Sequence, residues 1–130
     1  MKLNASGSAL IYATYIGDIS DDRGVGIAID SAGNAYVAGT TTSSNFPLVS
    51  SLRPSLGGGQ DAFVLKLNTS GNALLFSTYL GGGNVDSGAA IALDGAANTY
   101  VCGDTLSSDF PLHAAVHPAI GATPMFSSRS

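Results

Sequence analysis

The 130-residue sequence contains no glutamate and no tryptophan, and only five of its residues are lysine or arginine. Nine aspartates bring the net charge to −4, so the chain lacks the basic patches that nucleic-acid binding requires. Its single cysteine, Cys102, excludes a disulfide within the chain. No apolar run approaches the length of about 18 residues that a membrane-spanning helix needs.

What the sequence does contain is a repeat. Residues 2–48 align without a gap with residues 66–112, and about half of the aligned positions are identical. A fixed period of this kind is typical of architectures in which one supersecondary unit is copied and stacked. We therefore expect residues 1–130 to form a single segment of two units. Repeat 1 covers approximately residues 2–65, and repeat 2 approximately residues 66–130.

The two ends of the chain fall within the repeat pattern. Lys2 aligns with Lys66, so the chain starts inside a repeat, and residues 119–130 no longer resemble residues 55–66. We expect the last strand of repeat 2 to be degenerate or truncated. The interpretation that we favour is an excerpt of a longer protein, and the alternative is a complete protein of two repeats.

Four segments of each period have the composition of β-strands, namely residues 9–17, 25–30, 35–41 and 61–68. No stretch combines an apolar period of 3.6 residues with helix caps, so we expect little helix. Short turns between the strands predict an all-β fold built from four-stranded antiparallel meanders. One complete meander should run from about Gly24 to Gly81.

The second of these segments has unusually small side chains. Gly24, Gly26 and Ala28 alternate with aliphatic residues, and Gly88, Ala90 and Ala92 repeat the pattern. Such a strand suits a crowded position with sheets on both faces, as at the centre of a β-propeller where the blades converge. The sequence therefore predicts two blades of a partial propeller.

A long loop rich in serine, proline and glycine follows the third segment. Within residues 42–60, the sequence Phe46-Pro47-Leu48 recurs later as residues 110–112. We expect it to form an apolar plug that pins the loop to its own blade. Residues 57–59, three glycines, should give the loop a mobile return.

Several motifs together resemble a known family. STYLGG at residues 77–82, GVGIAIDSAGNAYVAG at residues 24–39, SSNFP at residues 43–47 and GGGQDAFVLKLNTSG at residues 57–71 are similar to the SBBP repeat. This is the seven-bladed β-propeller repeat of large bacterial and archaeal secreted and surface-layer-like proteins. The resemblance implies a propeller blade in a cell-surface or secreted protein, and it brings no catalytic residue. Ala97 departs from the pattern, which has glycine there.

Asp21 and Asp22 precede the small-residue strand, and Asp86 is the copy of Asp22. With Asp18 nearby, their carboxylates offer the oxygen ligands that calcium prefers. The spacing lacks the alternation of a calcium-binding EF-hand loop, however. The interpretation that we favour is turn capping, in which the carboxylates accept hydrogen bonds from backbone amides.

His113 and His117 stand four residues apart, which is a zinc-binding spacing on a helix. Pro118 prevents a helix there, so we favour two unrelated loop histidines. Cys102 aligns with Ala38, and we expect it to be a small buried residue and not a nucleophile. No residue has a pattern that predicts catalysis.

Two further pairs of residues fit turns. Asp30 and Asp94 close the second strand of each unit, where their side chains should bond to turn amides. Asn4 and Asn68 begin sequences that match the glycan acceptor pattern, but both coincide with a turn between strands. We expect structural roles at all four positions.

These observations favour a non-enzymatic structural or interaction module whose loops bind a protein or a surface polymer, with no cofactor. The alternative is part of a propeller enzyme, or a calcium-dependent ligand site at the central face. Two blades cannot close a ring. We therefore expect the isolated chain to be marginally stable and to self-associate through outer faces that carry Tyr12, Tyr36, Phe63 and Tyr100.

Overall fold

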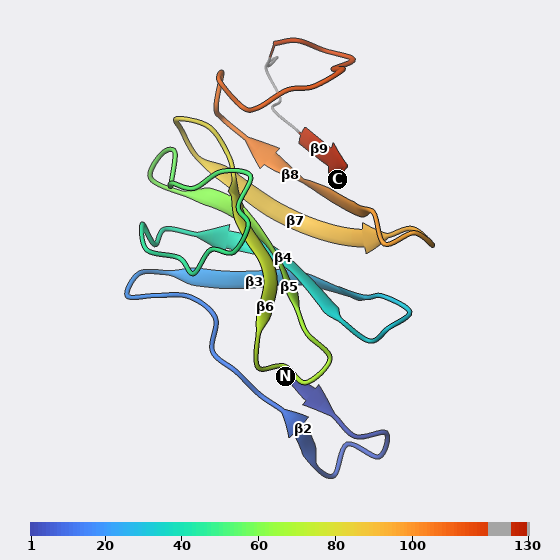
Figure 1. The fold of residues 1–130 in the computed structure, drawn as a ribbon. Helices are drawn as coiled ribbons and strands as arrows, with labels where there is room; N and C mark the ends of the chain where they lie inside the picture. The colour runs from blue at the N-terminus through green and yellow to red at the C-terminus, as the bar shows by residue number, and fades with distance from the viewer. Residues whose placement is uncertain (120–125, 130) are drawn as a thin grey trace.

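The computed structural model describes residues 1–119 and 126–129, and within them all regular secondary structure is β. Nine strands form three antiparallel sheets (Figure 1). In chain order the strands are β1 (Lys2–Leu3), β2 (Leu10–Tyr12), β3 (Asp22–Ile29), β4 (Ala35–Thr41), β5 (Asp61–Leu67), β6 (Leu74–Leu80), β7 (Asp86–Leu93), β8 (Thr99–Thr105) and β9 (Phe126–Arg129). The predicted all-β fold is confirmed.

The central sheet is the complete blade that the sequence predicts. Its strands follow one another in the order β3-β4-β5-β6, and each pairs with the next in antiparallel register. The innermost strand carries an irregularity between Gly24 and Gly26, and β7 has the same irregularity between Gly88 and Ala90. The two repeats therefore share even this local departure from regular pairing.

The other two sheets are parts of blades. Strands β7, β8 and β9 form a three-stranded sheet, and β1 pairs with β2. Despite its degenerate sequence, β9 places Phe126 opposite Gly103, the register that Phe63 holds opposite Gly39. The backbone pairing of the third strand thus survives the loss of its apolar alternation. The preceding residues 120–125 lie outside the described part of the chain.

The first predicted strand is shorter than expected. Residues 9–17 were expected to be extended throughout, but β2 covers only Leu10–Tyr12, whereas its copy β6 covers Leu74–Leu80. The difference follows from pairing: β6 lies beside the seven residues of β5, and β2 lies beside the two residues of β1. Strand length here is set by the neighbour and not by β-propensity.

The central sheet and the sheet of β7 pack face to face, with β7 on the side away from β1 and β2 (Figure 1). A Cβ at Gly26 would lie 3.2 Å from Cγ2 of Ile91, so a larger residue there would require Ile91 to shift by a few tenths of an ångström. The predicted crowding is confirmed on the face that meets the second blade, and the prediction of sheets on both faces is wrong, because Val25, Ile27 and Ile29 on the inner strand are exposed. The buried residues of this interface are Ala38, Ala62, Val64, Leu80, Val101 and Phe110.

The expectation of wet outer faces needs correction. Tyr36 and Phe63 are buried, because Tyr36 packs edge-on against Phe76 and Phe63 packs against the plug residue Phe46. Tyr100, the copy of Tyr36, is exposed, and Tyr12 is partly buried. The apolar side chains that do face solvent on the inner strand are Val25, Ile27 and Ile29.

Candidate functional site

The long connections gather at one end of the blades. Because the strands are antiparallel, the loop of residues 42–60 between β4 and β5 and the connection of residues 81–85 between β6 and β7 leave the sheet at the same end (Figure 1). The opposite end carries only tight turns. We call residues 42–60 the plug loop, and this loop-rich end is the candidate site.

The apolar plug pins the loop to its own blade, as predicted. Phe46 is buried with its ring centroid 4.6 Å from that of Phe63. The Tyr79 hydroxyl donates a hydrogen bond to the Ser43 carbonyl oxygen at 2.6 Å and accepts one from the Phe46 amide at 3.1 Å. A buried tyrosine thus clamps both ends of the short segment that carries the plug.

The plug also lies between blades, which the sequence did not indicate. Tyr12 and Ile16, from the segment before β3, pack against the same cluster as Phe46. In the second repeat, Phe110 packs with Val64 and Leu80 of the first blade. Each plug therefore fills the space between its own blade and the preceding one.

The rest of the plug loop follows the outer edge of β6. Val49 and Ser77 exchange two backbone hydrogen bonds, and the Arg53 amide donates to Oγ1 of Thr78 at 2.9 Å. This contact covers part of an edge strand that would otherwise present unpaired backbone groups. The loop is consequently ordered along its length and does not hang free.

Gly57 and Gly58 pack against the next connection, contrary to the predicted mobile return. A Cβ at Gly57 would overlap the Gly82 carbonyl oxygen, and one at Gly58 would overlap that of Asn84. Glycine is therefore required at both positions for close backbone approach. A Cβ at Gly59, in contrast, would meet no atom within 4 Å.

The tip of the plug loop recurs in both repeats. Ser50 and its copy Ala114 both adopt left-handed backbone conformations, with φ of 49° and 50°. Two residues later, Leu52 and its copy Val116 are 78% and 96% exposed. The gapless match of residues 2–48 with residues 66–112 ends before these residues. The signal that would have found them is its continuation to the recurring proline, Pro54 and Pro118.

Asp22 lies at the base of the plug loop, where its carboxylate accepts several hydrogen bonds. Thr41 Oγ1 donates to Oδ1, and Oδ2 accepts from Ser43 Oγ at 3.0 Å and from the Asp18 amide at 2.9 Å. The hydrogen bond from the Asp18 amide is the turn cap that the sequence predicts. Asp21 is exposed, and its backbone groups bond to Thr42.

Asp86 occupies the same position in the second repeat but has a different neighbour. Its Oδ2 accepts from the Gly82 amide at 2.8 Å and from Ser107 Oγ at 2.7 Å. A Cβ at Gly81 would lie 2.8 Å from this oxygen and 2.7 Å from Asp61 Oδ1, so the two carboxylate oxygens are at most 5.5 Å apart. The sequence did not single out Asp61.

The Asp61–Asp86 pair is fully buried at the seam between the two blades. Asp61 Oδ2 accepts from the Gly57 amide at 2.9 Å, while Oδ1 of both aspartates has no hydrogen-bond partner among the residues that the structure describes. Burial raises the pKa of the Asp61 carboxyl above its ordinary value, and the nearby Asp86 raises it further against the opposing effect of the Gly57 amide. The seam therefore makes ionisation of Asp61 less favourable than ionisation of an exposed aspartate.

The three aspartates proposed for calcium are thus divided between two places. Asp22 and Asp21 lie in the first blade, where the Asp22 carboxylate bonds to Ser43 and the Asp21 backbone bonds to Thr42. Asp86 lies near Asp61 at the seam between the blades. Across residues 1–119 and 126–129, no three histidine, cysteine or acidic side chains gather in a way that could hold a metal ion. The geometry supports turn capping and blade joining.

These repeated features are those of stacked propeller blades. A family model described as the SBBP beta-propeller repeat matches residues 11–47 and again residues 75–111. The chain belongs to the SBBP repeat family. Each SBBP match runs from the last strand of one blade, through the first two strands of the next, to its plug. No curated protein matches the chain.

The remaining candidates fall on the surface of the SBBP blades. His113 and His117 are exposed in a segment without helix, at the positions that Val49 and Arg53 hold in the first repeat. Cys102 is exposed, whereas the sequence predicted a buried residue. The reason is its side of the sheet: Ala38 is covered by the second blade, and no sheet of the described residues covers Cys102. No described helix is long and apolar enough to cross a membrane.

The turns at the opposite end of the SBBP blades are capped as predicted. Asp30 Oδ1 accepts from the amides of Ala32 and Asn34, and Asp94 makes the equivalent bonds in the second repeat. The side-chain amide of Asn34 is the main cause that lowers the pKa of Asp30 to about 2. Lys66 Nζ, 3.6 Å from Asp30 Oδ2, adds to this effect.

The two asparagines also form turns. Asn68 Oδ1 accepts from the amides of Asn72 and Ala73, and Asn4 makes the matching bonds with Ser8 and Ala9. The predicted structural role of both residues is confirmed.

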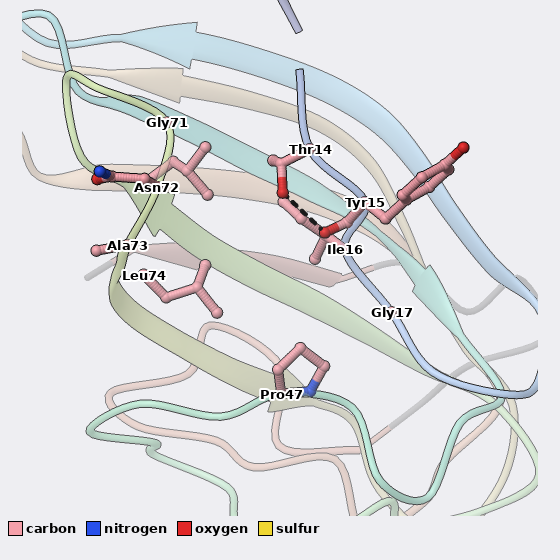
Figure 2. Close-up of a pocket in the computed structure, with 10 residues that line it drawn as sticks. Thr14, Tyr15, Ile16, Gly17, Pro47, Gly71, Asn72, Ala73 and Leu74 are labelled. Atoms are coloured by element: carbon pink, nitrogen blue, oxygen red, sulfur yellow. Dashed lines mark hydrogen bonds between the residues drawn. The ribbon is translucent and has the colours of Figure 1, made fainter. Parts of the chain in front are cut away.

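A cavity of about 210 Å³ lies between the segment before β3 and the hairpin of β5 and β6. Figure 2 shows Thr14 and Ile16 facing the hairpin, with the Thr14 hydroxyl bonded to the Tyr15 carbonyl oxygen. Leu67, Leu74 and Pro47 make much of the lining apolar. The cavity is part of the seam between blades.

Proposed function

We propose that the chain is a non-enzymatic interaction module, part of a β-propeller in a cell-surface or secreted protein, and that its plug loops bind a protein partner. The observation that carries the proposal is the repeated loop tip, where Leu52 and Val116 hold equivalent positions and are 78% and 96% exposed. Burial of exposed apolar side chains under a partner contributes favourably to the free energy of binding.

The plug loop is suited to recognition because it is preorganised. Phe46 anchors the start of the loop, and the hydrogen bonds of Val49 and Arg53 hold its middle against β6. A loop that is ordered before binding loses little conformational entropy on binding. The apolar tip is followed by Arg53 in one repeat and His117 in the other, which adds polar groups beside each apolar contact.

The role without catalysis is supported by what the repeat preserves. The recurring residues are strand cores, turn caps, the plug and the aspartate at the base of each plug, and packing and hydrogen bonding account for their repeated spacing. The extracellular or cell-surface location is supported by the membership of the SBBP family, whose repeats occur in surface and secreted proteins.

Substitution of the two loop tips tests the proposal. The labelled wild-type chain and the variant L52S/V116S are applied to an array of bacterial cell-envelope proteins and surface polysaccharides. We expect the wild type to bind protein spots and the variant to bind them at least about tenfold more weakly, since apolar anchors dominate interfaces. Both chains should melt at the same temperature.

The matched control is T69A, which alters an exposed side chain in the turn at the opposite end. It should bind as the wild type does. Equal binding by L52S/V116S, retention on polysaccharide spots alone, or the absence of any bound spot for the wild type would each contradict a protein partner at the loop tips.

A further inference from the structure

The Asp61–Asp86 pair at the seam holds more carboxylate oxygen than the surrounding donors satisfy. Both side chains are fully buried, and a Cβ at Gly81 would lie 2.7 Å from Asp61 Oδ1 and 2.8 Å from Asp86 Oδ2. Oδ1 of each aspartate has no hydrogen-bond partner among the residues that the structure describes. A buried carboxylate oxygen without a partner costs free energy, so a ligand that brings positive charge to this place is favoured.

The second oxygen of each carboxylate is held by donors that suit the ionised form. Asp61 Oδ2 accepts from the Gly57 amide at 2.9 Å, and Asp86 Oδ2 accepts from the Gly82 amide at 2.8 Å and from Ser107 Oγ at 2.7 Å. Hydrogen bonds donated to a carboxylate stabilise it relative to the protonated acid. These donors fix the orientation of both side chains and leave the same atom, Oδ1, without a partner on each.

Asp22, the copy of Asp86, shows a satisfied carboxylate at the equivalent position. Its Oδ1 accepts from Thr41 Oγ1, and its Oδ2 accepts from Ser43 Oγ at 3.0 Å. In the second repeat the serine bond to Oδ2 is kept, but no described residue donates to Oδ1. The unsatisfied oxygen therefore belongs to the seam, where Asp61 faces Asp86, and is not a feature of every repeat.

The seam also lacks a basic side chain bonded to the pair. Among the described residues, the ion pair joins Lys66 to Asp30, at the opposite end of the blade. Burial raises the pKa of Asp61, and Asp86 raises it further, whereas Arg53 lowers it by a smaller amount. The charges of the two carboxylates are thus left largely uncompensated by the described side chains.

We propose that Asp61 and Asp86 form a calcium-binding site at the seam between the two blades. Calcium binds oxygen ligands in a flexible geometry, and two bonds of about 2.3–2.6 Å bridge oxygens that are up to about 5 Å apart. The carboxylate oxygens on either side of Gly81 are at most 5.5 Å apart, which is compatible with such a bridge. Magnesium fits this buried place less well, because it retains several waters when it binds.

Backbone carbonyl oxygens supply further ligands, because only two acidic side chains meet at the seam. Calcium takes 6–8 oxygens, and backbone carbonyls are among its usual ligands. The connection of residues 81–85 runs beside the pair, with the Gly82 carbonyl oxygen packed against Gly57. Bound calcium would join the return of the first plug loop, through Asp61, to the base of the second, through Asp86. This inference concerns the seam and does not depend on binding at the loop tips.

Titration of the full chain with calcium chloride tests the site. After dialysis against EDTA and removal of the chelator, calorimetry should give one calcium ion per wild-type chain. Saturating calcium should raise the melting temperature by at least about 5 °C, because it binds the folded chain only. In D61N, which keeps the size of the side chain, calcium affinity should fall at least about tenfold. A cooperative melt of D61N shows that the variant is folded.

The matched control is D22N, which changes the copy of Asp86 whose oxygens already have partners. It should bind calcium as the wild type does. L52S/V116S should also retain the response, which separates this site from the proposed loop function. Sodium chloride of equal ionic strength should not reproduce the shift. The absence of heat and of a melting shift for the wild type, equal affinity in D61N, an equal loss in D22N, or an equal response to magnesium chloride would each overturn the proposal.

Discussion

At the scale of single residues, the two repeats differ most clearly where one of them lacks glycine. Gly33 and its copy Ala97 both have positive φ, of 92° and 63°. A Cβ in the left-handed region costs about 1–2 kcal/mol, so Ala97 strains a turn that Asp94 otherwise holds well. The strain arises because alanine stands at position 97, where the repeat pattern has glycine.

Relief of this strain should stabilise the chain. We predict that A97G raises the free energy of unfolding by about 0.5–1 kcal/mol, after the greater flexibility of glycine in the unfolded chain is subtracted. Urea unfolding measures the change. The neighbouring A96G, at a position without positive φ, should lower stability, and a stabilisation of equal size there would contradict the explanation.

Asp30 makes stability depend on acid. Because the pKa of its carboxyl falls from 3.8 to about 2 on folding, its contribution is full above pH 4 and is lost as the pH falls through about 2. We predict that D30N destabilises the protein at pH 7 and that this difference shrinks at pH 2. Urea unfolding at both values checks it, with D104N, an exposed position, as the control that should change little at either pH.

Asp61 should act in the opposite direction. Its pKa is raised in the folded protein, so its contribution is present below its ordinary pKa and is lost as the pH rises through the raised value. We predict that D61N, which stays neutral, gains stability relative to the wild type between pH 4 and pH 8. Unfolding curves at the two values decide it. A relative loss over that range would show that folding lowers the pKa of Asp61 and would contradict this explanation.

At the scale of elements, the plug is the connection that holds blade and loop together. Phe46 contacts Phe63 and Tyr79 in its own blade and shares its cluster with Tyr12 of the preceding segment. A large buried side chain at such a junction supports three elements at once.

Truncation of the plug should therefore be costly. We predict that F46A lowers the free energy of unfolding by about 3–5 kcal/mol, the usual loss for a buried phenylalanine. The control L52A, in the same loop but 78% exposed, should change it by less than about 0.5 kcal/mol. Urea unfolding measures both changes. Equal stability of F46A and L52A would contradict the role of the plug.

The sequence predicted the elements well because their determinants are local. Alternation at residues 61–68, small residues at Gly24 and Gly26, and the turn aspartates Asp30 and Asp94 each act within a few residues. The predicted plug is also confirmed, because a repeated Phe-Pro-Leu within a polar loop indicates apolar side chains that pack against the blade. The length of β2 was wrong, because it depends on how many residues of the adjacent strand are present to pair with it.

At the scale of the whole molecule, burial depends on which blade is present beside a residue. Cys102 was expected to be buried because its copy Ala38 has a similar size and the same strand position, yet among the described residues a sheet covers Ala38 and none covers Cys102. The meeting of Asp61 with Asp86 was missed for a related reason. They come from different repeats, and no spacing within one repeat brings them together.

The central claim is that the burial of equivalent strand positions in the two repeats depends on whether a neighbouring blade covers them. Thiol alkylation of the variant A38C in dilute solution tests it most directly, because the thiol introduced at position 38 and the thiol of Cys102 would then report on the same position in adjacent blades. We predict that iodoacetamide modifies Cys102 rapidly and the introduced thiol at least about 100-fold more slowly, since reaction there requires the blades to separate. Equal rates at the two thiols, read from the mass of the tryptic peptides, would show that the blades do not pack and would contradict the account.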